Sequence, residues 1–214
     1  MSTSIADMRK EYTQRALDIT DVAPDPIQQF TQWFEEARKT QVPEPNAMHL
    51  ATVSALGKPS GRIVLLKGIA EQQFLFYTNY QSRKGQEIAH TPYVCLTFFW
   101  PELERQIRIE GTIHRLDEQT STDYFHSRPR ESQIGAWVSP QSQTIEARSV
   151  LDERRESFTQ KFAGQEIPKP PHWGGYAVTP ESLEFWQGRP SRLHDRIFYQ
   201  IDSKGQWQLQ RLAP

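Results

Sequence analysis

The spacing of hydrophobic residues changes along the chain, and each change predicts a different kind of element. Just after residue 25, apolar side chains recur every three or four positions, at Ile27, Phe30, Phe34 and Ala37. This is the period of a helix that buries one face. Asp25 followed by Pro26 is a typical helix start, because Asp caps the first turn and Pro suits the first helical position.

From Met48 onwards the hydrophobic residues alternate with polar ones, which is the two-residue period of β-strands. The pattern covers MHLATVSA, GRIVLLK and QQFLFYTN, with the turn-forming LGKP between the first two, and resumes in YVCLTFFW and RQIRIEGTIHRL. In the last run Ile107 and Ile109 alternate with the polar residues Gln106, Arg108 and Glu110, so the polar three share one face. We expect an antiparallel meander, interrupted by a short helix at SRKGQEIAH.

The second half of the chain adds helices and then further strands. Asp117 is a candidate cap for a helix through Tyr124, and a second helical stretch extends from about 144 to 162. Four strand-like runs follow, near YAVT, LEFW, RIFYQ and WQLQRL. Many strands with a few helices predict a mainly β, α+β fold: a closed or half-closed antiparallel barrel with flanking helices.

We expect one domain preceded by an N-terminal arm. Residues 1–24 are polar and end in VAPDP, which predicts a mobile arm or short helix outside the core. Residues 25–214 show no internal repeat and no linker, and a chain of this length can bury a substantial core as a single domain.

Composition and charge disfavour several classes of function. The 25 basic and 26 acidic residues give a net charge of −1, which offers no general attraction for nucleic acid. The chain starts without an apolar signal-peptide core and has no run of roughly 20 apolar residues, so we expect a cytoplasmic protein with no membrane contact. Cys95, the one cysteine, is expected to be a buried thiol, and the histidines show no metal-ligand spacing, so no metal is expected.

The richest candidate for chemistry is the segment 124–142, YFHSRPRESQIGAWVSPQS. It combines Arg128 and Arg130 with several hydroxyls and amides, which together could saturate a phosphate with charge-assisted hydrogen bonds. On composition alone, a solvated polar loop is also typical of such a segment. Tyr124 and Arg128 are four residues apart, so a helix would place both on one face.

A second cationic set lies in or just after the predicted strands, at Arg62, Lys67, Arg83 and Lys84. Taken singly, each is typical of a surface charge. Strict alternation would place Arg62 and Lys67 on opposite faces of their strand.

Several motifs in fixed order resemble one known family. They are RIVLLK, SRK, LERQ, YFHSRPRESQIGAWVS, WGG, FWQG, RLHDR and the terminal RLAP, with a weaker RKEY at 9–12. Together they resemble pyridoxine/pyridoxamine 5′-phosphate oxidases. The resemblance implies a flavin-binding split barrel that uses FMN to convert pyridoxamine or pyridoxine 5′-phosphate to pyridoxal 5′-phosphate, with O2 as acceptor and H2O2 as product. It also implies a homodimer with FMN at the subunit interface.

The resemblance assigns roles to particular positions of this sequence. The FMN-binding positions would be Arg62, Ile63, Val64, Leu65, Leu66, Lys67, Tyr77, Thr78, Arg83, Lys84, Gln106, Gln141, Ser142, Trp186 and Arg196. The substrate-binding positions would be Arg9, Lys10, Glu11, Tyr12, Lys67, Tyr124, Arg128, Ser132, Arg192, Leu193 and His194. Arg192 and His194 would be the catalytic pair that holds the substrate's ring and hydroxyl against the flavin.

Two alternatives remain. Another flavin split-barrel enzyme, such as a reductase with a nicotinamide donor, would keep the flavin set without needing the substrate-phosphate set and RLHDR together. A non-catalytic protein that carries pyridoxal phosphate or a flavin would differ in lacking turnover.

Overall fold

The computed structural model describes residues 4, 5 and 11–214 of the 214-residue chain. Its contacts divide the chain into two compact units. Unit 1 comprises Met1–Leu50, Cys95–Gly111 and Pro180–Pro214, and unit 2 comprises Ala51–Val94 and Thr112–Thr179.

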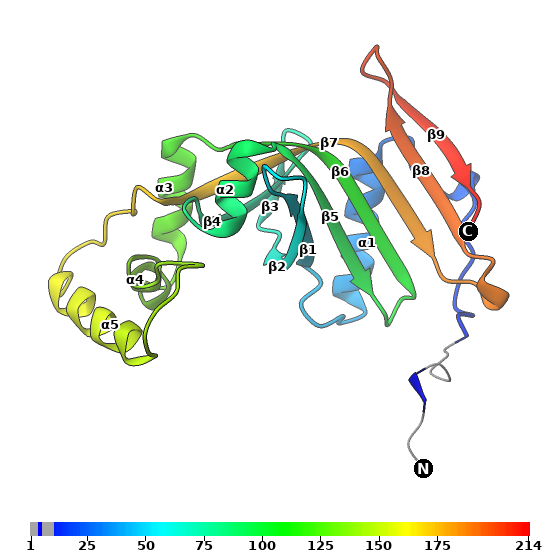
Figure 1. Ribbon diagram of the computed structural model, residues 1–214. Coiled ribbons are helices and arrows are strands. Elements are labelled where there is room, and N and C mark those ends of the chain that lie inside the picture. The colour runs from blue at the N-terminus through cyan, green and yellow to red at the C-terminus, as the bar shows by residue number, and fades with distance from the viewer. Residues whose placement is uncertain (1–3, 6–10) are drawn as a thin grey trace. The chain divides into compact units, whose positions relative to one another are not determined.

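The described residues contain one nine-stranded sheet (Figure 1). The predicted meander is not kept throughout it, because residues 74–79 pair with residues 173–178 and not with the strand that follows at 93–100. The strand order is β2-β1-β5-β6-β7-β4-β3, and β8 pairs with β7 and with β9. The pairings of β3 with β4, β4 with β7, β7 with β8 and β8 with β9 are antiparallel. The bounds are β1 (Ala47–Val53), β2 (Pro59–Leu65), β3 (Gly68–Ala70), β4 (Gln73–Asn79), β5 (Tyr93–Trp100), β6 (Arg105–Arg115), β7 (Trp173–Gln187), β8 (Asp195–Ile201) and β9 (Trp207–Leu212).

β7 corrects the sequence prediction, because the runs YAVT and LEFW belong to one strand of 15 residues. Pro180 lies inside it and does not interrupt it. Residues 173–178 pair with β4 and residues 182–187 pair with β8, so the proline falls where the strand passes from one neighbour to the other. A missing N–H is tolerated at such a place, whereas within a continuous ladder it would remove a hydrogen bond.

In unit 1, helix α1 (Pro26–Lys39) begins as predicted, with the Asp25 carboxylate accepting a hydrogen bond from the Ile27 N–H at 2.7 Å. Its buried face includes Phe30 and Trp33. The Phe30 ring packs 5.1 Å from that of Phe98, and the Trp33 ring lies 5.2 Å from that of Phe185, measured between centroids. These aromatic contacts form the core of unit 1.

The N-terminal segment also belongs to unit 1. After the described residues 4 and 5, the chain from residue 11 leads to a short 3-10 helix, η2 (Ile19–Asp21). Leu17 is buried, and its N–H donates to the Asp195 carboxylate at 3.0 Å. The N–H groups of Thr13 and Gln14 both donate to the Glu104 carboxylate. The expectation that this segment lies outside the core is therefore wrong for Leu17, whereas residues 13–16 are exposed.

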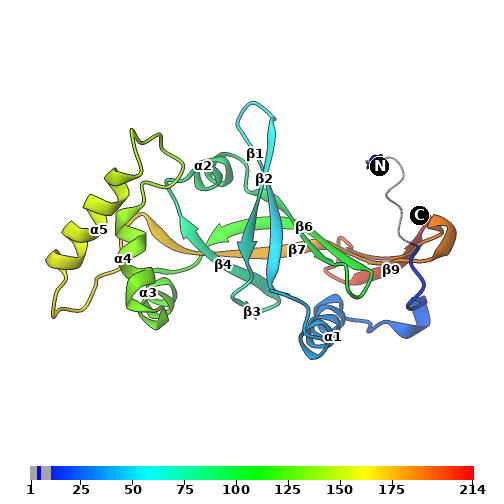
Figure 2. The ribbon, with the colours of Figure 1, turned by 90° about the horizontal axis from the view of Figure 1, so that it is seen from below.

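Unit 2 contains four helices among its described residues: α2 (Arg83–His90), α3 (Glu118–Ser127), α4 (Arg130–Val138) and α5 (Ser149–Lys161). Figure 2 shows α4 beside α5, on the side that also carries α3. Phe125, Ile134 and Phe162 bury their side chains between these segments, together with Trp173 of β7. The helical stretch predicted from about 144 begins at Ser149. Helix α4 begins directly after Pro129, a residue whose type suits a break or a helix start.

None of the helices in the described part of the chain is long and apolar enough to cross a membrane. Cys95 in β5 is half-buried, and burial raises the pKa of its thiol.

Candidate functional site

Unit 2 holds a cavity of about 590 Å³ that brings together side chains from several segments. This volume is within the range of small-molecule sites. The lining residues are Ile63, Val64, Leu65, Lys67, Tyr77, Thr78, Asn79, Lys84, Tyr124, Arg128, Pro129, Ser132, Gly135, Ala136, Ser139, Gln141 and Trp173. They come from the end of β2, from β4, from the start of β7, and from the helices α2, α3 and α4 with their connections.

The cavity is cationic, because Lys67, Lys84 and Arg128 line it and none of its lining residues is acidic. The Lys84 side chain is buried and its Nζ donates to Thr78 Oγ1 at 3.3 Å and to Gln141 Oε1 at 3.2 Å. Burial lowers the pKa of the Lys84 ammonium, and the nearby Arg62 lowers it further. These charges favour an anionic ligand.

Arg128 contributes a polar atom that has no protein partner. Its Nη1 is buried and makes no hydrogen bond with any residue that the structure describes. The guanidinium lies 4.5 Å from the centroid of the Trp173 ring, and burial lowers its pKa. A buried N–H donor without an acceptor is uncommon, so its position on a cavity wall points to an external acceptor.

Aromatic rings form another wall of the cavity. The rings of Tyr77 and Tyr124 stack with centroids 3.7 Å apart, and Tyr77 stacks with Trp173 at 5.6 Å. Gly175 makes room for this arrangement, since a Cβ there would lie 2.8 Å from Tyr77 Cε1 and 2.5 Å from Leu116 Cδ1. Flat ring faces beside positively charged side chains suit a ligand with a planar ring and a negative charge.

Two local predictions about this site are corrected. Helix α3 ends at Ser127 and Arg128 has extended backbone angles, so Tyr124 and Arg128 do not share a helix, although both reach the cavity. β2 ends at Leu65, so alternation does not extend from Arg62 to Lys67. The Lys67 N–H instead donates to the Leu75 carbonyl in the next strand pair.

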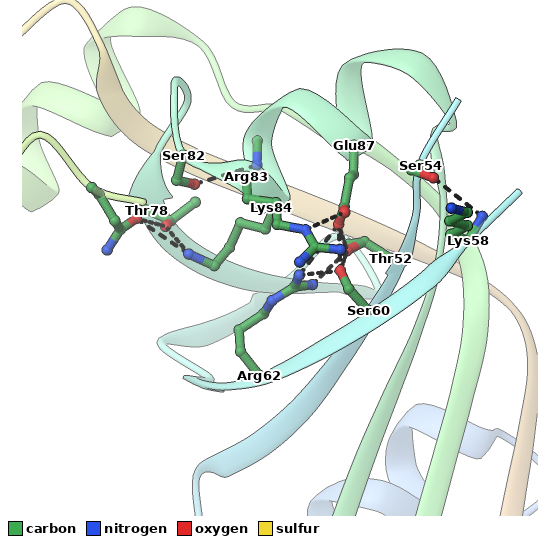
Figure 3. A network of polar contacts seen from close by, with 12 residues as sticks. Thr52, Ser54, Lys58, Ser60, Arg62, Thr78, Ser82, Arg83, Lys84 and Glu87 are labelled. Carbon is green, nitrogen blue, oxygen red and sulfur yellow. Dashed lines mark hydrogen bonds and ion pairs between the residues drawn. The ribbon is translucent and has the colours of Figure 1, made fainter. Parts of the chain in front are cut away.

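Arg62 and Arg83 converge on Glu87, a buried residue of α2 (Figure 3). Arg62 Nη2 lies 3.2 Å from Glu87 Oε2, and Arg83 Nε lies 2.9 Å from Oε1. Thr52 and Ser60 donate their hydroxyl hydrogens to Oε2 at 2.5 and 2.6 Å. Burial by itself would raise the pKa of the Glu87 carboxyl, but these hydrogen bonds outweigh it and lower the pKa to about 2.

A second group of predicted residues lies in unit 1 around His194. Its ring is 4.6 Å from that of Trp186 and 5.9 Å from that of Tyr12. The Arg189 N–H donates to His194 Nδ1 at 3.1 Å, which places the proton of the neutral ring on Nε2. Burial lowers the pKa of His194, and the positive charge of Arg192 lowers it further, so the neutral ring is favoured.

Arg196 in the same unit is held by a buried carboxylate. Glu184 accepts hydrogen bonds from Arg196 Nε at 2.8 Å and Nη2 at 3.0 Å, and from Arg108 Nη2 at 2.8 Å. Gln106 is half-buried on β6, between the buried Arg105 and Ile107.

The predicted site residues thus fall into groups. The cavity brings together Ile63, Val64, Leu65, Lys67, Tyr77, Thr78, Lys84, Tyr124, Arg128, Ser132 and Gln141. Leu66 is buried and Ser142 is exposed, and neither lines the cavity. Unit 1 contains Glu11, Tyr12, Gln106, Trp186, Arg192, Leu193, His194 and Arg196. Arg9 and Lys10 lie outside the described residues.

Sequence reasoning missed some residues of these groups. Trp173 lines the cavity and could have been noticed as the aromatic residue of WGG. Glu87 and Glu184 were missed because a single acidic residue in a sequence carries no sign of burial. The four-residue spacing of Arg83 and Glu87 on a helix was the one available signal.

Comparisons with known proteins agree across the chain. Residues 34–161 match the family described as "Pyridoxamine 5'-phosphate oxidase", and residues 173–214 match "Pyridoxine 5'-phosphate oxidase C-terminal dimerisation region". The chain is 56% identical over 212 residues to a pyridoxine/pyridoxamine 5′-phosphate oxidase of Acaryochloris marina, covering 99% of this chain and 96% of the relative. It is 56% identical over 214 residues to one of Leptospira interrogans, covering 100% of both chains.

Solved structures with the same fold include two that cover most of this chain. PhzG from Burkholderia lata, crystallised with tetrahydrophenazine-1-carboxylic acid, has a TM-score of 0.86 at 29% identity and covers 91% of this chain and 95% of its own. A pyridoxamine 5′-phosphate oxidase-related, FMN binding protein from Nostoc punctiforme has a TM-score of 0.70 at 17% identity, with coverages of 89% and 98%. These neighbours confirm the predicted split-barrel fold. Taken with the full-length relatives, they show that the chain belongs to the pyridoxine/pyridoxamine 5′-phosphate oxidase family.

Proposed function

We propose that this protein is an FMN-dependent oxidase that converts pyridoxamine 5′-phosphate and pyridoxine 5′-phosphate to pyridoxal 5′-phosphate, with O2 as acceptor and H2O2 as product. The observation that carries the proposal is the cationic, aromatic-lined cavity of unit 2, in which Arg128 presents a buried N–H donor without a partner among the described residues. Full-length relatives of 56% identity that are named pyridoxine/pyridoxamine 5′-phosphate oxidases support it.

The residues present fit a flavin mononucleotide. The group combines a planar ring with a phosphate, and this unit combines stacked rings with cations and no acidic lining residue. In the proposal, Arg62, Arg83 and Lys84 hold the phosphate, while Thr78 and Gln141 supply polar contacts. Unit 1 contributes Gln106, Trp186 and Arg196 as flavin-contacting residues. The bound flavin supplies the hydride acceptor for the oxidation.

The substrate's phosphate is assigned to Lys67, Tyr124, Arg128 and Ser132. A guanidinium fork and an ammonium group neutralise the phosphate dianion, and the two hydroxyls can donate to its remaining oxygens. Because Arg128 Nη1 is already desolvated, little water has to be removed from it when an anion binds. These residues therefore fix one end of the substrate and leave its ring to be positioned by others.

Arg192 and His194 are proposed to hold the substrate's ring and hydroxyl. The hydrogen bond from the Arg189 N–H to Nδ1 leaves the Nε2 proton of the neutral ring as the donor. The packing of Trp186 and Tyr12 against His194 limits rotation of the imidazole. Holding the reacting carbon in a fixed orientation is the rate contribution that such a site makes.

We also propose that the protein is a homodimer with FMN bound at the interface of its subunits. The match of residues 173–214 to a dimerisation region supports this assembly. The matched region contains β7, β8 and β9.

The proposed activity is tested by the visible absorption spectrum of the FMN-loaded protein before and after anaerobic addition of pyridoxamine 5′-phosphate. Bleaching of the flavin, recovery of its colour in air and release of peroxide are expected. Bleaching by a nicotinamide donor but not by this substrate would favour a flavin reductase. Flavin binding without turnover of either would favour a carrier protein, and a failure to bind FMN would overturn the proposal.

A further inference from the structure

Glu87 is the most heavily hydrogen-bonded buried carboxylate of unit 2 outside the residues already given a role. Its side chain is 6% exposed, and it receives bonds from three elements: Thr52 of β1, Ser60 and Arg62 of β2, and Arg83 of α2. Both oxygens are used, Oε1 by Arg83 and Oε2 by the other three. Such a residue orders its partners and leaves little capacity for a ligand of its own.

Besides the direct bond between Arg62 and Glu87, the hydroxyls of Thr52 and Ser60 bridge these two side chains. Thr52 Oγ1 donates to the carboxylate and accepts from Arg62 Nη1 at 2.5 Å, and Ser60 Oγ donates to it and accepts from Arg62 Nη2 at 2.6 Å. Figure 3 shows the Arg62 guanidinium pointing into this arrangement. Each hydroxyl has only one hydrogen. Because Glu87 accepts that hydrogen, the hydroxyl is held in one orientation, and its oxygen lone pairs face the Arg62 guanidinium.

Arg83 is oriented by the same carboxylate from the other side. Its Nε donates to Glu87 Oε1 one helical turn away, while its side chain is 64% exposed. Its two Nη groups have no protein partner among the described residues. The bond to Nε therefore holds the guanidinium plane while the outer edge of the group stays available for an external anion.

We propose that Glu87 is a positioning residue that orients Arg62 and Arg83 for the phosphate of FMN, without touching the cofactor itself. This inference rests on the proposed function, because it takes FMN as the ligand of that cationic set. The depressed pKa of Glu87 fits this role, since the carboxylate stays ionised throughout the neutral range.

The proposal makes a prediction opposite in sign to simple electrostatics. Glu87→Gln removes a negative charge beside a site for a dianion, so Coulomb attraction alone predicts tighter binding of FMN. The amide, however, offers one acceptor oxygen where the carboxylate offers two, and its NH2 group faces donors. If Glu87 positions the arginines, the substitution weakens binding instead.

The test is a fluorescence titration of full-length apoprotein with FMN and, separately, with riboflavin, which lacks the phosphate. We expect Glu87→Gln to raise the Kd for FMN about 10- to 100-fold, the range for hydrogen bonds to charged groups, with the Kd for riboflavin unchanged. Glu87→Asp, which keeps the charge and both oxygens, should recover part of the loss. Glu153→Gln on the exposed face of α5 removes the same charge elsewhere and should match the wild type.

Each other outcome overturns the inference. Unchanged or tighter FMN binding by Glu87→Gln would make Glu87 a simple counter-charge. An equal loss of FMN and riboflavin would make it a structural residue. If Glu87→Gln does not fold, Ser60→Ala provides a second test, because it removes one bridging hydroxyl and no charge. It should weaken the binding of FMN and leave the binding of riboflavin unchanged. Wild-type affinity for FMN in that variant would overturn the inference. A wild-type protein that binds neither flavin would instead overturn the proposed function on which the inference rests.

Discussion

Buried charged groups in the described part of the chain are matched by partners, and Arg128 Nη1 is the informative exception. Glu87 and Glu184 each accept hydrogen bonds from two arginines. Arg128 Nη1 is buried with no acceptor in the described part of the chain. Because an unmatched buried donor lowers stability, such a donor on a cavity wall is best explained by a ligand that completes it.

Replacing Arg128 by Lys should therefore raise the KM for pyridoxamine 5′-phosphate about 10-fold and change kcat much less. Lysine keeps the positive charge but loses the planar fork that binds two phosphate oxygens at once. Steady-state kinetics at saturating FMN would measure both constants. Arg155→Lys, at an exposed ion pair with Glu131, is the matched control. A fall in kcat with an unchanged KM would show that Arg128 does not act through substrate binding.

Glu87 also predicts how the stability of the apoprotein depends on pH. Its pKa in the folded state, about 2, is below the ordinary value of 4.5, so its contribution to stability is present above pH 4.5 and is lost as the pH falls towards 2. The shift corresponds to roughly 3 kcal/mol at neutral pH, of which about 2 kcal/mol is lost by pH 3.

Denaturant unfolding at pH 7 and pH 3 would measure this contribution. The free energy of unfolding should fall less between the two pH values in Glu87→Gln than in the wild type, since the amide does not titrate. Glu153→Gln should behave as the wild type does. An equal fall in all three proteins would contradict the assigned pKa.

Among the elements, the N-terminal segment depends on a few specific bonds for its place in unit 1. One oxygen of the Glu104 carboxylate accepts from the N–H groups of Thr13 at 2.9 Å and Gln14 at 3.1 Å. Tyr12, directly before them, contacts Trp186 and His194. The position of the Tyr12 ring therefore depends on the hydrogen bonds that the next two backbone N–H groups donate to Glu104.

Glu104→Ala should speed hydrogen exchange at the amides of Thr13 and Gln14 about 10-fold, because both lose their acceptor. Exchange in β7 should be unchanged. Glu102→Ala removes a neighbouring exposed carboxylate and serves as the control. Unchanged exchange at residues 13 and 14 in the Glu104 variant would show that other contacts hold the segment.

The elements that were predicted well are those whose pattern is local. Alternation identified β1, β2 and β4, and the buried pair Ile107 and Ile109 in β6 confirms the predicted face. The division of β7 into two predicted strands was wrong because contacts between distant segments decide where this strand ends. Pro180 suggests a break in the strand until its place between two partner strands is known.

At the scale of the whole molecule, the 214-residue chain is expected to assemble as a dimer. Mass photometry or sedimentation of the FMN-loaded protein should give twice the chain mass of 24.9 kDa at micromolar concentration. The supporting observation is the match of residues 173–214 to a dimerisation region. A monomer under these conditions would contradict the proposed assembly, without bearing on the roles assigned within unit 2.

Motifs identified most of the candidate site, and physical patterns alone identified little of it. RIVLLK, SRK and the segment 124–142 supply much of the lining of one cavity. A sequence does not reveal that Arg128 Nη1 lacks a partner or that Glu87 is buried, because both depend on residues far apart in the chain. The motifs therefore indicated which residues matter, and the structure supplied the reasons for some of them.

The half-buried thiol of Cys95 bears on how long such an enzyme would survive its own chemistry. Peroxide attacks the thiolate form of cysteine, and the raised pKa of Cys95 keeps the sulfur protonated at neutral pH. Each proposed turnover releases an oxidant beside a protein whose single cysteine reacts with it slowly. Oxidation of this thiol by the released peroxide should therefore be slow at neutral pH.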